Sequence, residues 1–348
     1  MRKRRPIIVS PSGNLYGSEK VLLDFLATAE EDYEIYLPEG RLRRRIAGQL
    51  PQVRLRVFSR VQLLYPELFL RMIFSSRRFL YCNEGGHIRR IGLLARLLPH
   101  KRFFVHLRIA EDCGPARLRN LPDNVTLIVV SDYLMGLLPE MVRAKSVRLH
   151  DPYLASGRKG DSGRFRMSPL PKIGVVGRVT RTKGLQELAG LTDYAEAHGT
   201  ELEIHLFGSF DPTEEAVYAF RRKMECYRFV RIVFEGFVEH MEAAYDSMDV
   251  IWHFSLTEPL GRIFFEALDS GTFFTGFDSG GIGEIGHELG LSGFLVEYGE
   301  GWEKRFLASL KRLHGQDAHK AFCRAAKKMQ EAFSPSGYAR ALETLFKK

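Results

Sequence analysis

The feature of this 348-residue chain that most limits its fold is an alternation, present twice, of short apolar runs with longer helical patterns. Short apolar runs followed by amphipathic stretches are typical of parallel strands covered by helices. The first series occupies residues 6–10, 33–37, 53–57, 79–82, 102–107 and 125–131. The second occupies residues 173–176, 203–207, 231–234, 250–254, 272–275 and 294–296. The pattern predicts an α/β fold with two parallel sheets, each covered by helices on both faces.

A stretch rich in Gly, Ser and Pro, residues 155–171, separates the two series and predicts a linker between domains 1–154 and 172–333. A chain of this length, 45% hydrophobic, can bury two cores. Two such domains joined once would leave a cleft between them, and ligands of open parallel sheets bind at the carboxyl ends of the strands. The last segment, 334–348, predicts a final helix beginning at Ser334 or Ser336.

Three glutamates mark the segment from Ser255 to Glu284. Glu258 and Glu266 bracket the turn Pro259, Leu260 and Gly261, and a glycine pair, Gly280 and Gly281, precedes Glu284. Because a residue before proline avoids the helical conformation, Glu258 is expected in the loop before a helix that Pro259 opens, with Glu266 about two turns inside it. Glu258 could accept hydrogen bonds from sugar hydroxyls, and Glu266 could hold the two hydroxyls of a ribose. The alternative is a buried helix with two incidental acids.

A second segment, marked by basic residues, lies upstream: KIGVVGRVTRTKG, residues 172–184. A short apolar run ends at the turn glycine Gly177, and Arg178 and Lys183 follow before a helix expected to run through Ala197. Two cations after a strand, next to the free N–H groups at the start of a helix, can bind a diphosphate. Basic residues at a strand end can also be ordinary solvated side chains.

In this order, the two segments resemble the C-terminal half of the retaining glycosyltransferases of family 4, which have the GT-B fold of two Rossmann-like domains. The likeness runs through IGVVGRVTRTKG, LEIHLFGSF, FEGFV and the segment from Ser255 to Glu284, and covers about residues 172–300. One departure is Phe254, where the family often has proline before the serine that matches Ser255. The resemblance implies a central cleft and a final helix, 334–348, that returns to the first domain.

The resemblance also implies roles for single residues. In the family, the residues that match Arg178 and Lys183 bind the donor diphosphate, the one that matches Glu258 contacts the donor sugar, and the one that matches Glu266 holds the ribose. The expected donor-binding set is Gly17, Gly177, Arg178, Lys183, Glu258, Pro259, Leu260, Gly261, Glu266, Gly280 and Gly281. The expected catalytic set is Arg178, Lys183, Glu258 and His106.

The N-terminal half resembles the family at two places. Gly13 and Gly17 flank a loop before a helix, and Gly17 matches the glycine that lies near the donor phosphate in the family. A plain turn between strand and helix is the alternative. His106 ends an apolar run and matches a histidine beside the donor sugar, which either hydrogen-bonds the sugar or only shapes the pocket. The loop after it carries Arg108, Glu111 and Asp112, which are candidates to meet the acceptor.

The net charge of +9 is unevenly divided. Residues 1–150 hold 26 Lys and Arg against 14 Asp and Glu, whereas the rest of the chain holds 25 against 28. The cations gather at residues 41–45, 77–78, 89–90 and 101–102. A basic N-terminal half favours an acidic partner: anionic lipid headgroups, a lipid diphosphate, an acidic glycan or nucleic acid. The segment HIRRIGLLARLLPHKR, residues 87–102, could lie on a bilayer surface or pack on its own sheet as an ordinary amphipathic helix.

The cysteines, the spacing of the carboxylates and the length of the apolar runs indicate which cofactors and which cellular location to expect. The four cysteines, Cys82, Cys113, Cys226 and Cys323, are scattered without metal-like spacing, and no D-x-D pair of carboxylates suggests a bound divalent ion. We therefore expect no metal and no cofactor, only a nucleoside diphosphate sugar as donor substrate. No apolar run reaches membrane-spanning length, which predicts a cytoplasmic protein with peripheral attachment to the inner face of the membrane as an option.

The sequence thus predicts a hexosyltransferase-type enzyme that moves a sugar from a nucleoside diphosphate sugar to a hydroxyl. The expected acceptor is a glycan or lipid-linked molecule of bacterial surface polysaccharide, lipopolysaccharide or exopolysaccharide assembly. Two other functions stay open: a sugar-nucleotide epimerase with the same fold, and a non-enzymatic nucleic-acid-binding protein prompted by the pI of about 9.4. Against nucleic acid, the arginines are not interleaved with aromatic residues in a recognisable module, so no nucleic-acid partner is expected.

Overall fold

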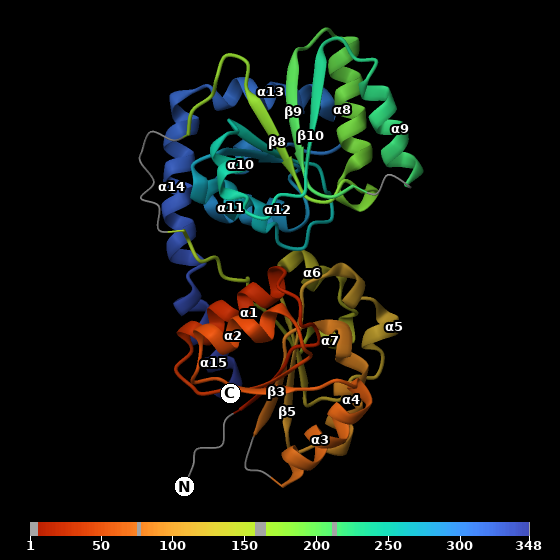
Figure 1. Cartoon of the computed structure of the whole chain (residues 1–348), viewed down its shortest axis with the longest axis vertical. Coiled ribbons are helices and arrows are strands. Elements are labelled where there is room, and N and C mark those ends of the chain that lie inside the picture. Colours follow the sequence, from red (N-terminus) through yellow and green to blue (C-terminus); the bar gives the residue numbers. More distant parts are fainter. Residues whose placement is uncertain (1–5, 75–77, 157–164, 211–213, 348) are drawn as a thin grey trace. The chain divides into compact units, whose positions relative to one another are not determined.

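The computed structural model describes residues 6–74, 78–156, 165–210 and 214–347. The chain divides into two compact units: unit 1 comprises residues 1–154 and 332–348, and unit 2 comprises residues 155–331. Each unit is built around one parallel sheet with helices on both faces (Figure 1). The segments at Arg77 and at residues 157–164 of the expected linker lie outside the described residues.

Unit 1 contains a parallel sheet in the order β3-β2-β1-β4-β5-β6-β7. Its strands are β1 (Ile7–Val9), β2 (Glu34–Leu37), β3 (Arg54–Val57), β4 (Phe79–Cys82), β5 (Arg102–Leu107), β6 (Val125–Val129) and β7 (Ser146–Arg148). Ile8 on the central strand pairs with Ile35 on one side and Tyr81 on the other. Because the chain leaves β1 toward β2 and later returns to β4, the strand order reverses between β1 and β4, which is where ligands bind in such sheets.

The helices of unit 1 cover the two faces of this sheet (Figure 1). One face carries α1 (Gly17–Thr28), α2 (Arg41–Gln49) and α15 (Pro335–Lys347). The other carries α3 (Val61–Ile73) and α4 (Ile88–Leu97). Shorter elements complete the unit: η1 (Gly85–His87), η2 (Ala110–Asp112), α5 (Pro115–Leu118), α6 (Asp132–Leu137) and α7 (Glu140–Arg143).

The C-terminal helix α15 belongs to the core of unit 1. It packs on α1, and its Phe346 stacks on Phe79 with ring centroids 4.5 Å apart. The hydroxyl of Tyr33 donates to Glu343 on this helix at 3.1 Å. The hydroxyl of Ser334 accepts the N–H of Gly337, so Ser334 caps the helix as the sequence predicts. The return of the last helix to the first domain is confirmed.

Unit 2 contains a parallel sheet in the order β10-β9-β8-β11-β12. Its strands are β8 (Lys172–Val176), β9 (Leu202–Phe207), β10 (Val230–Gly236), β11 (Val250–His253) and β12 (Phe273–Gly276). The chain moves from β8 toward β10 and then returns to β11 on the other side of β8. The strand order therefore reverses between β8 and β11, and the loops that follow these two strands border the ligand-binding position of this type of sheet.

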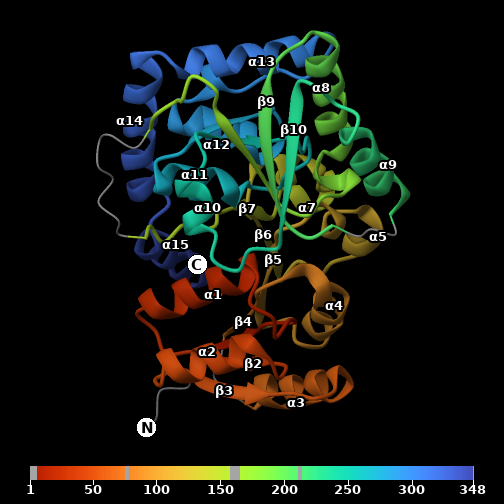
Figure 2. The same ribbon diagram turned by 45° about the horizontal axis from the view of Figure 1, so that its top comes forward.

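The helices of unit 2 also lie on both faces of its sheet (Figures 1 and 2). They are η3 (Arg181–Lys183), α8 (Leu185–Ala197), α9 (Glu215–Met224), α10 (Glu242–Asp246), α11 (Arg262–Ser270), α12 (Gly280–Leu289), η4 (Ser292–Phe294), α13 (Trp302–Leu313) and α14 (Gln316–Ala332). In both views α8 and α9 cover one face, and α11 and α12 cover the other. From β8 the chain first runs through β9 to β10 on one side and later through β11 to β12 on the other. Because crossover connections between parallel strands are right-handed, the helices of these two series lie on opposite faces of the sheet.

The predicted fold of two parallel-sheet α/β domains is confirmed, with two local differences. The apolar run at residues 294–296 is not a strand: Phe294 ends η4, and only Val296 forms a bridge, to Phe277. The run is apolar because Leu295 and Val296 are buried. The strand β7 escapes prediction because its three residues, Ser-Val-Arg, are partly exposed and form no apolar run.

Candidate donor-binding site

The loops after β8 and β11 contact each other at the carboxyl edge of the unit 2 sheet. Gly177 follows β8 with φ of +132°, and Gly184, with φ of +85°, precedes α8. A Cβ atom at Gly184 would lie 2.4 Å from the backbone carbon of Phe254, so only glycine allows this approach. The close contact places the Arg178–Lys183 loop directly against the end of β11.

Lys183 and Glu258 form an ion pair across the two loops, with Nζ 2.7 Å from Oε2. Both side chains keep some access to solvent, 34% for Lys183 and 16% for Glu258. Arg178 is exposed, and it lines the same pocket as Gly177 and Lys183. The structure therefore brings together, within unit 2, a carboxylate and two cations that lie 75 and 80 positions before it in the sequence.

The start of α12 fixes the backbone of the Glu258–Gly261 loop. The N–H of Gly281 donates to the carbonyl of Glu258 at 2.7 Å. A Cβ atom at Gly281 would lie 2.5 Å from the Cα of Leu260, and one at Gly280 would lie 2.9 Å from the Glu258 carbonyl oxygen. The glycine pair thus permits α12 to press against this loop and holds Glu258 in place. Pro259 and Leu260 lie inside the supported loop.

The helix that carries Glu266 begins later than the sequence predicts. Gly261, with φ of +88°, precedes α11, whose first residue is Arg262 instead of Pro259. Glu266 therefore lies about one turn inside the helix, not two. The left-handed conformation of Gly261 breaks the helix at that point, and periodicity does not reveal it. The hydroxyl of Tyr245, on α10, donates to Glu266 at 2.7 Å and fixes its carboxylate. Glu266 is not among the residues that line the pocket of Arg178 and Lys183.

The sequence reasoning missed His253, the last residue of β11. It is buried, and its Nε2 atom, 3.7 Å from Oε2 of Glu258, has no hydrogen-bond partner in the described part of the chain. Burial, with a smaller contribution from Lys183, lowers the pKa of His253 to about 4, so the ring is neutral at neutral pH. The available signal was one polar residue that closes an otherwise apolar run, as at His106.

Unit 1 holds two of the expected site residues, Gly17 and His106. Gly17 is the first residue of α1, after the loop that follows β1. His106 lies on β5, one residue before its end, with no exposed surface, and its Nδ1 is 2.9 Å from the hydroxyl of Tyr81. Burial, together with the neighbouring Arg108, holds the pKa of His106 well below its usual value. The roles expected for Gly17 and His106 stay predictions.

Two of the residues considered for acceptor contact are engaged inside unit 1. Arg108 is 9% exposed and binds Asp151 with its Nε, 2.9 Å from Oδ2. Asp112 is buried and accepts a hydrogen bond from Arg117. Neither side chain is free to meet a substrate in this arrangement. Glu111, between them in sequence, is exposed.

The described residues contain no group of three or more His, Cys, Asp and Glu side chains arranged to hold a metal ion. The chemistry of the site as it stands is electrostatic. A guanidinium, an ammonium group and the N–H groups near a helix start are suited to a diphosphate, and a carboxylate 2.7 Å from the ammonium is suited to hydroxyls.

Residues 170–331 match the model of the family described as glycosyl transferases group 1. The chain therefore carries a domain of this family, and the predicted enzyme class, a glycosyltransferase, is confirmed. No curated protein is significantly similar to the chain in sequence. The assignment to family 4 in particular stays a prediction.

Several solved structures resemble the whole chain in fold. The structure of Anabaena HepE in complex with UDP has a TM-score of 0.74 at 17% identity and covers 99% of this chain and 100% of that chain. The lipopolysaccharide outer core galactosyltransferase WaaB in its apo form has a TM-score of 0.72 at 12% identity, covering 99% of each chain. Sucrose-phosphate synthase from Thermosynechococcus elongatus has a TM-score of 0.66 at 16% identity, covering 99% and 98%. These likenesses confirm the GT-B fold.

Proposed function

We propose that this glycosyltransferase moves a hexosyl group, with retention of anomeric configuration, from a nucleoside diphosphate sugar to a hydroxyl acceptor. The observation that carries the proposal is the contact between Lys183 and Glu258, beside Arg178, where the strand order of unit 2 reverses. A sugar nucleotide has both chemical groups that this pair needs. Its diphosphate replaces Glu258 as the partner of Lys183, and its sugar hydroxyls replace Lys183 as the partner of Glu258.

The proposed reaction breaks the bond between the anomeric carbon and the diphosphate oxygen. Negative charge develops on the leaving diphosphate, and Arg178 and Lys183 stabilise it there. The acceptor oxygen forms the new bond on the same face of the sugar, and its proton passes to the leaving diphosphate. Glu258 then binds the sugar and is not the nucleophile. Glu266, held by Tyr245, binds the ribose hydroxyls.

For the donor, we propose a UDP-sugar as the first choice, because HepE, which shares the fold, has been solved with UDP and with UDP-glucose. The test is a thermal-shift comparison of UDP-glucose with other nucleoside diphosphate sugars. A donor present at about 100 times its Kd stabilises the folded state by about 2.7 kcal/mol, which gives a shift of a few degrees. No shift with any sugar nucleotide contradicts the proposal. Conversion of the donor to its epimer without acceptor supports the epimerase instead.

For the acceptor side, we propose that unit 1 lies against an anionic membrane, as suits assembly of a surface glycan. The helices α3 and α4 pack on each other, and each exposes apolar side chains. These are Leu63, Leu70, Ile73, Phe74, Leu93 and Leu97. On α4 the leucines alternate with the exposed Arg89, Arg90 and Arg96. Apolar and cationic side chains on one helix suit the interface of an anionic bilayer. Within the described residues, the structure has no helix with the length and hydropathy of a membrane span.

Replacing Leu93 and Leu97 together by serine tests the membrane proposal. They are 60% and 58% exposed, so the change removes little packing from the folded protein. If both enter the bilayer interface, we expect binding to vesicles of phosphatidylcholine and phosphatidylglycerol to weaken at least about tenfold, by the transfer free energy of two leucines. The matched control replaces Leu154 and Leu170, also 63% and 50% exposed, by serine. Equal binding of both double variants in a sedimentation assay contradicts the proposal.

A further inference from the structure

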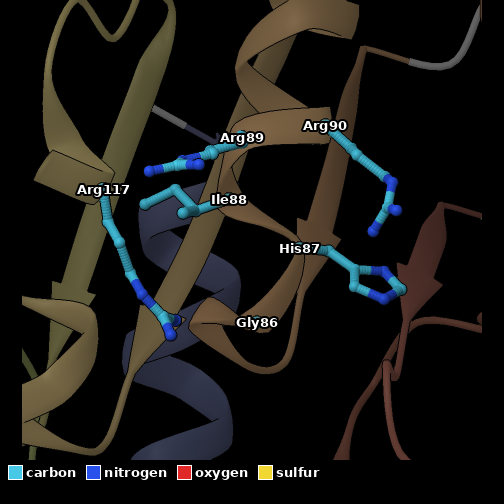
Figure 3. Close-up of a pocket in the computed structure, with 6 residues that line it drawn as sticks. All are labelled: Gly86, His87, Ile88, Arg89, Arg90 and Arg117. Atoms are coloured by element: carbon cyan, nitrogen blue, oxygen red, sulfur yellow. The ribbon is translucent and has the colours of Figure 1, made fainter.

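A hollow of about 520 Å³ lies within unit 1. It is lined by Gly86, His87, Ile88, Arg89, Arg90 and Arg117. In Figure 3, Arg89 and Arg117 lie on one side of the loop at Gly86, and Arg90 and His87 lie on the other. The six lining residues include three arginines and no acid. Five of them, residues 86–90, follow β4, one of the two strands between which the strand order of unit 1 reverses, and Arg117 lies on α5. This position is the usual ligand edge of an open parallel sheet.

Two of the three guanidinium groups are held by the structure around them. Arg89 donates from Nη2 to the carbonyl of Ala116 at 3.1 Å, and Arg117 donates to the carboxylate of Asp112. A guanidinium has five N–H donors, so each keeps donors for a ligand after these bonds. Holding the side chains in place before binding reduces the entropy that a ligand must overcome.

Two carboxyl groups flank the loop that carries Gly86. Asp112 lies under this loop: a Cβ atom at Gly85 would be 2.4 Å from its Oδ2. Asp112 is the ion-pair partner of Arg117 and offsets the charge of that arginine, so Arg89 and Arg90 supply the net positive charge of the lining residues. Glu84 accepts a hydrogen bond from the hydroxyl of Ser18, on α1, at 2.7 Å, and burial raises its pKa.

His87 gives an independent sign of a ligand. It is 8% exposed and lines the hollow, its ring packs edge-on against Tyr65, and its Nδ1 has no hydrogen-bond partner in the described part of the chain. A buried polar atom without a partner costs free energy unless a ligand or water satisfies it. The backbone beside it is accessible, since a Cβ atom at Gly86 would meet nothing within 4 Å. The N–H groups at the start of the 10-residue helix α4 add to the attraction for an anion.

We propose that this hollow is a phosphate-binding subsite of the acceptor. The charges of Arg89 and Arg90, the remaining N–H donors of Arg117 and a helix start match a group that carries two negative charges and several acceptor oxygens. The inference rests on the proposed glycosyl transfer and adds the chemical class of the acceptor, a phosphate-bearing molecule, together with the residues that bind it. The phosphate comes either from a soluble phosphorylated acceptor or from a lipid headgroup.

The first arm of the test uses inorganic pyrophosphate and the full chain. The background carries Arg178→Ala and Lys183→Ala, so that binding at the donor site does not contribute. In calorimetric titration we expect Arg89→Gln with Arg90→Gln to weaken pyrophosphate binding at least about tenfold, because each charge-assisted hydrogen bond contributes that order of affinity. The control is Arg96→Gln, which removes an exposed arginine of the same helix that does not line the hollow. Arg117 is left unchanged because it neutralises the buried Asp112.

The second arm uses vesicles of phosphatidylcholine with and without phosphatidylglycerol. If Arg89→Gln with Arg90→Gln loses binding to pyrophosphate, the result supports a soluble phosphate. If this double variant loses binding only to the vesicles that contain phosphatidylglycerol, the result supports a lipid headgroup. Unchanged binding in both arms, or an equal loss of pyrophosphate binding in Arg96→Gln, overturns the proposal. Pyrophosphate binding is measured with Arg178 and Lys183 replaced, so a negative result there contradicts only the phosphate subsite. A missing thermal shift with sugar nucleotides contradicts the proposed glycosyl transfer.

Discussion

Replacing Lys183 by alanine is expected to lower kcat/KM for the donor by about 10²–10³-fold, the usual effect of removing one group that stabilises developing negative charge. The ammonium group of Lys183 lies where the strand order of unit 2 reverses, and it donates a hydrogen bond to the carboxylate of Glu258. With alanine, the leaving diphosphate loses one of its two cations, whereas the fold loses only a partly exposed ion pair. Such a pair contributes at most about 1 kcal/mol to stability. Steady-state kinetics with the donor that stabilises the protein, together with the Tm of the variant, measure both quantities.

The matched control for this variant is Lys172→Ala. Lys172 is an exposed lysine at the first position of β8, the opposite end of the strand from Gly177. Its removal changes the net charge of the chain equally but leaves the carboxyl edge of the sheet intact, so we expect activity near that of the wild type. Wild-type turnover in Lys183→Ala, or an equal decrease in the two variants, would show that the loop after β8 does not bind the leaving group.

The second large effect is on stability: Asp151→Asn should destabilise unit 1 by about 3 kcal/mol. Nε of Arg108 donates to both carboxylate oxygens of Asp151, at 3.0 Å to Oδ1 and 2.9 Å to Oδ2. Both side chains are more than nine-tenths buried. Breaking a buried pair leaves a charge without compensation, which costs far more than breaking an exposed pair. The comparison variant is Glu39→Gln, which removes the partner of Arg43 in a pair that is 43% and 63% exposed. We expect a change below about 1 kcal/mol for that variant.

The effect of Asp151→Asn on unit 1 can be measured separately from the unfolding of unit 2. The only tryptophans, Trp252 and Trp302, are in unit 2, so tryptophan emission during urea unfolding reports on unit 2. Circular dichroism reports on the helices of both units. For Asp151→Asn, we expect the dichroism signal to fall at lower urea while the emission transition stays in place. Coincident transitions at the wild-type midpoint would contradict the assignment of a stabilising role to this pair.

The strands could be predicted from the sequence because a buried parallel strand needs a continuous apolar run, and the runs are short and separated by amphipathic helices. The start of α15 could be predicted from a serine cap. The positions that failed depend on contacts between distant segments. Residues 294–296 are apolar because they are buried, not because they pair along a strand. The start of α11 depends on the left-handed conformation of Gly261, which periodicity does not encode.

For the site, the charged residues could be predicted, but their mutual arrangement could not. Arg178, Lys183 and Glu258 stand out because cations and carboxylates follow strand ends. The ion pair between Lys183 and Glu258 requires knowing that β8 and β11 are adjacent, although β9 and β10 lie between them in the chain. His253 was missed because a single histidine in an apolar run also fits an ordinary buried residue. The hollow at Arg89, Arg90 and Arg117 depends on the contact of α4 with α5.

The ion pair between Lys183 and Glu258 has a consequence for selectivity. An anion that displaces the carboxylate from the ammonium group leaves Glu258 negative and without its cation, in a position that is only 16% exposed. Inorganic phosphate or a free nucleotide offers nothing to compensate for that loss. An intact sugar nucleotide compensates for it, because hydroxyl groups replace the ammonium as donors. We therefore expect the resting protein to discriminate against fragments of the proposed donor, and to release the spent nucleotide more readily once the sugar has departed.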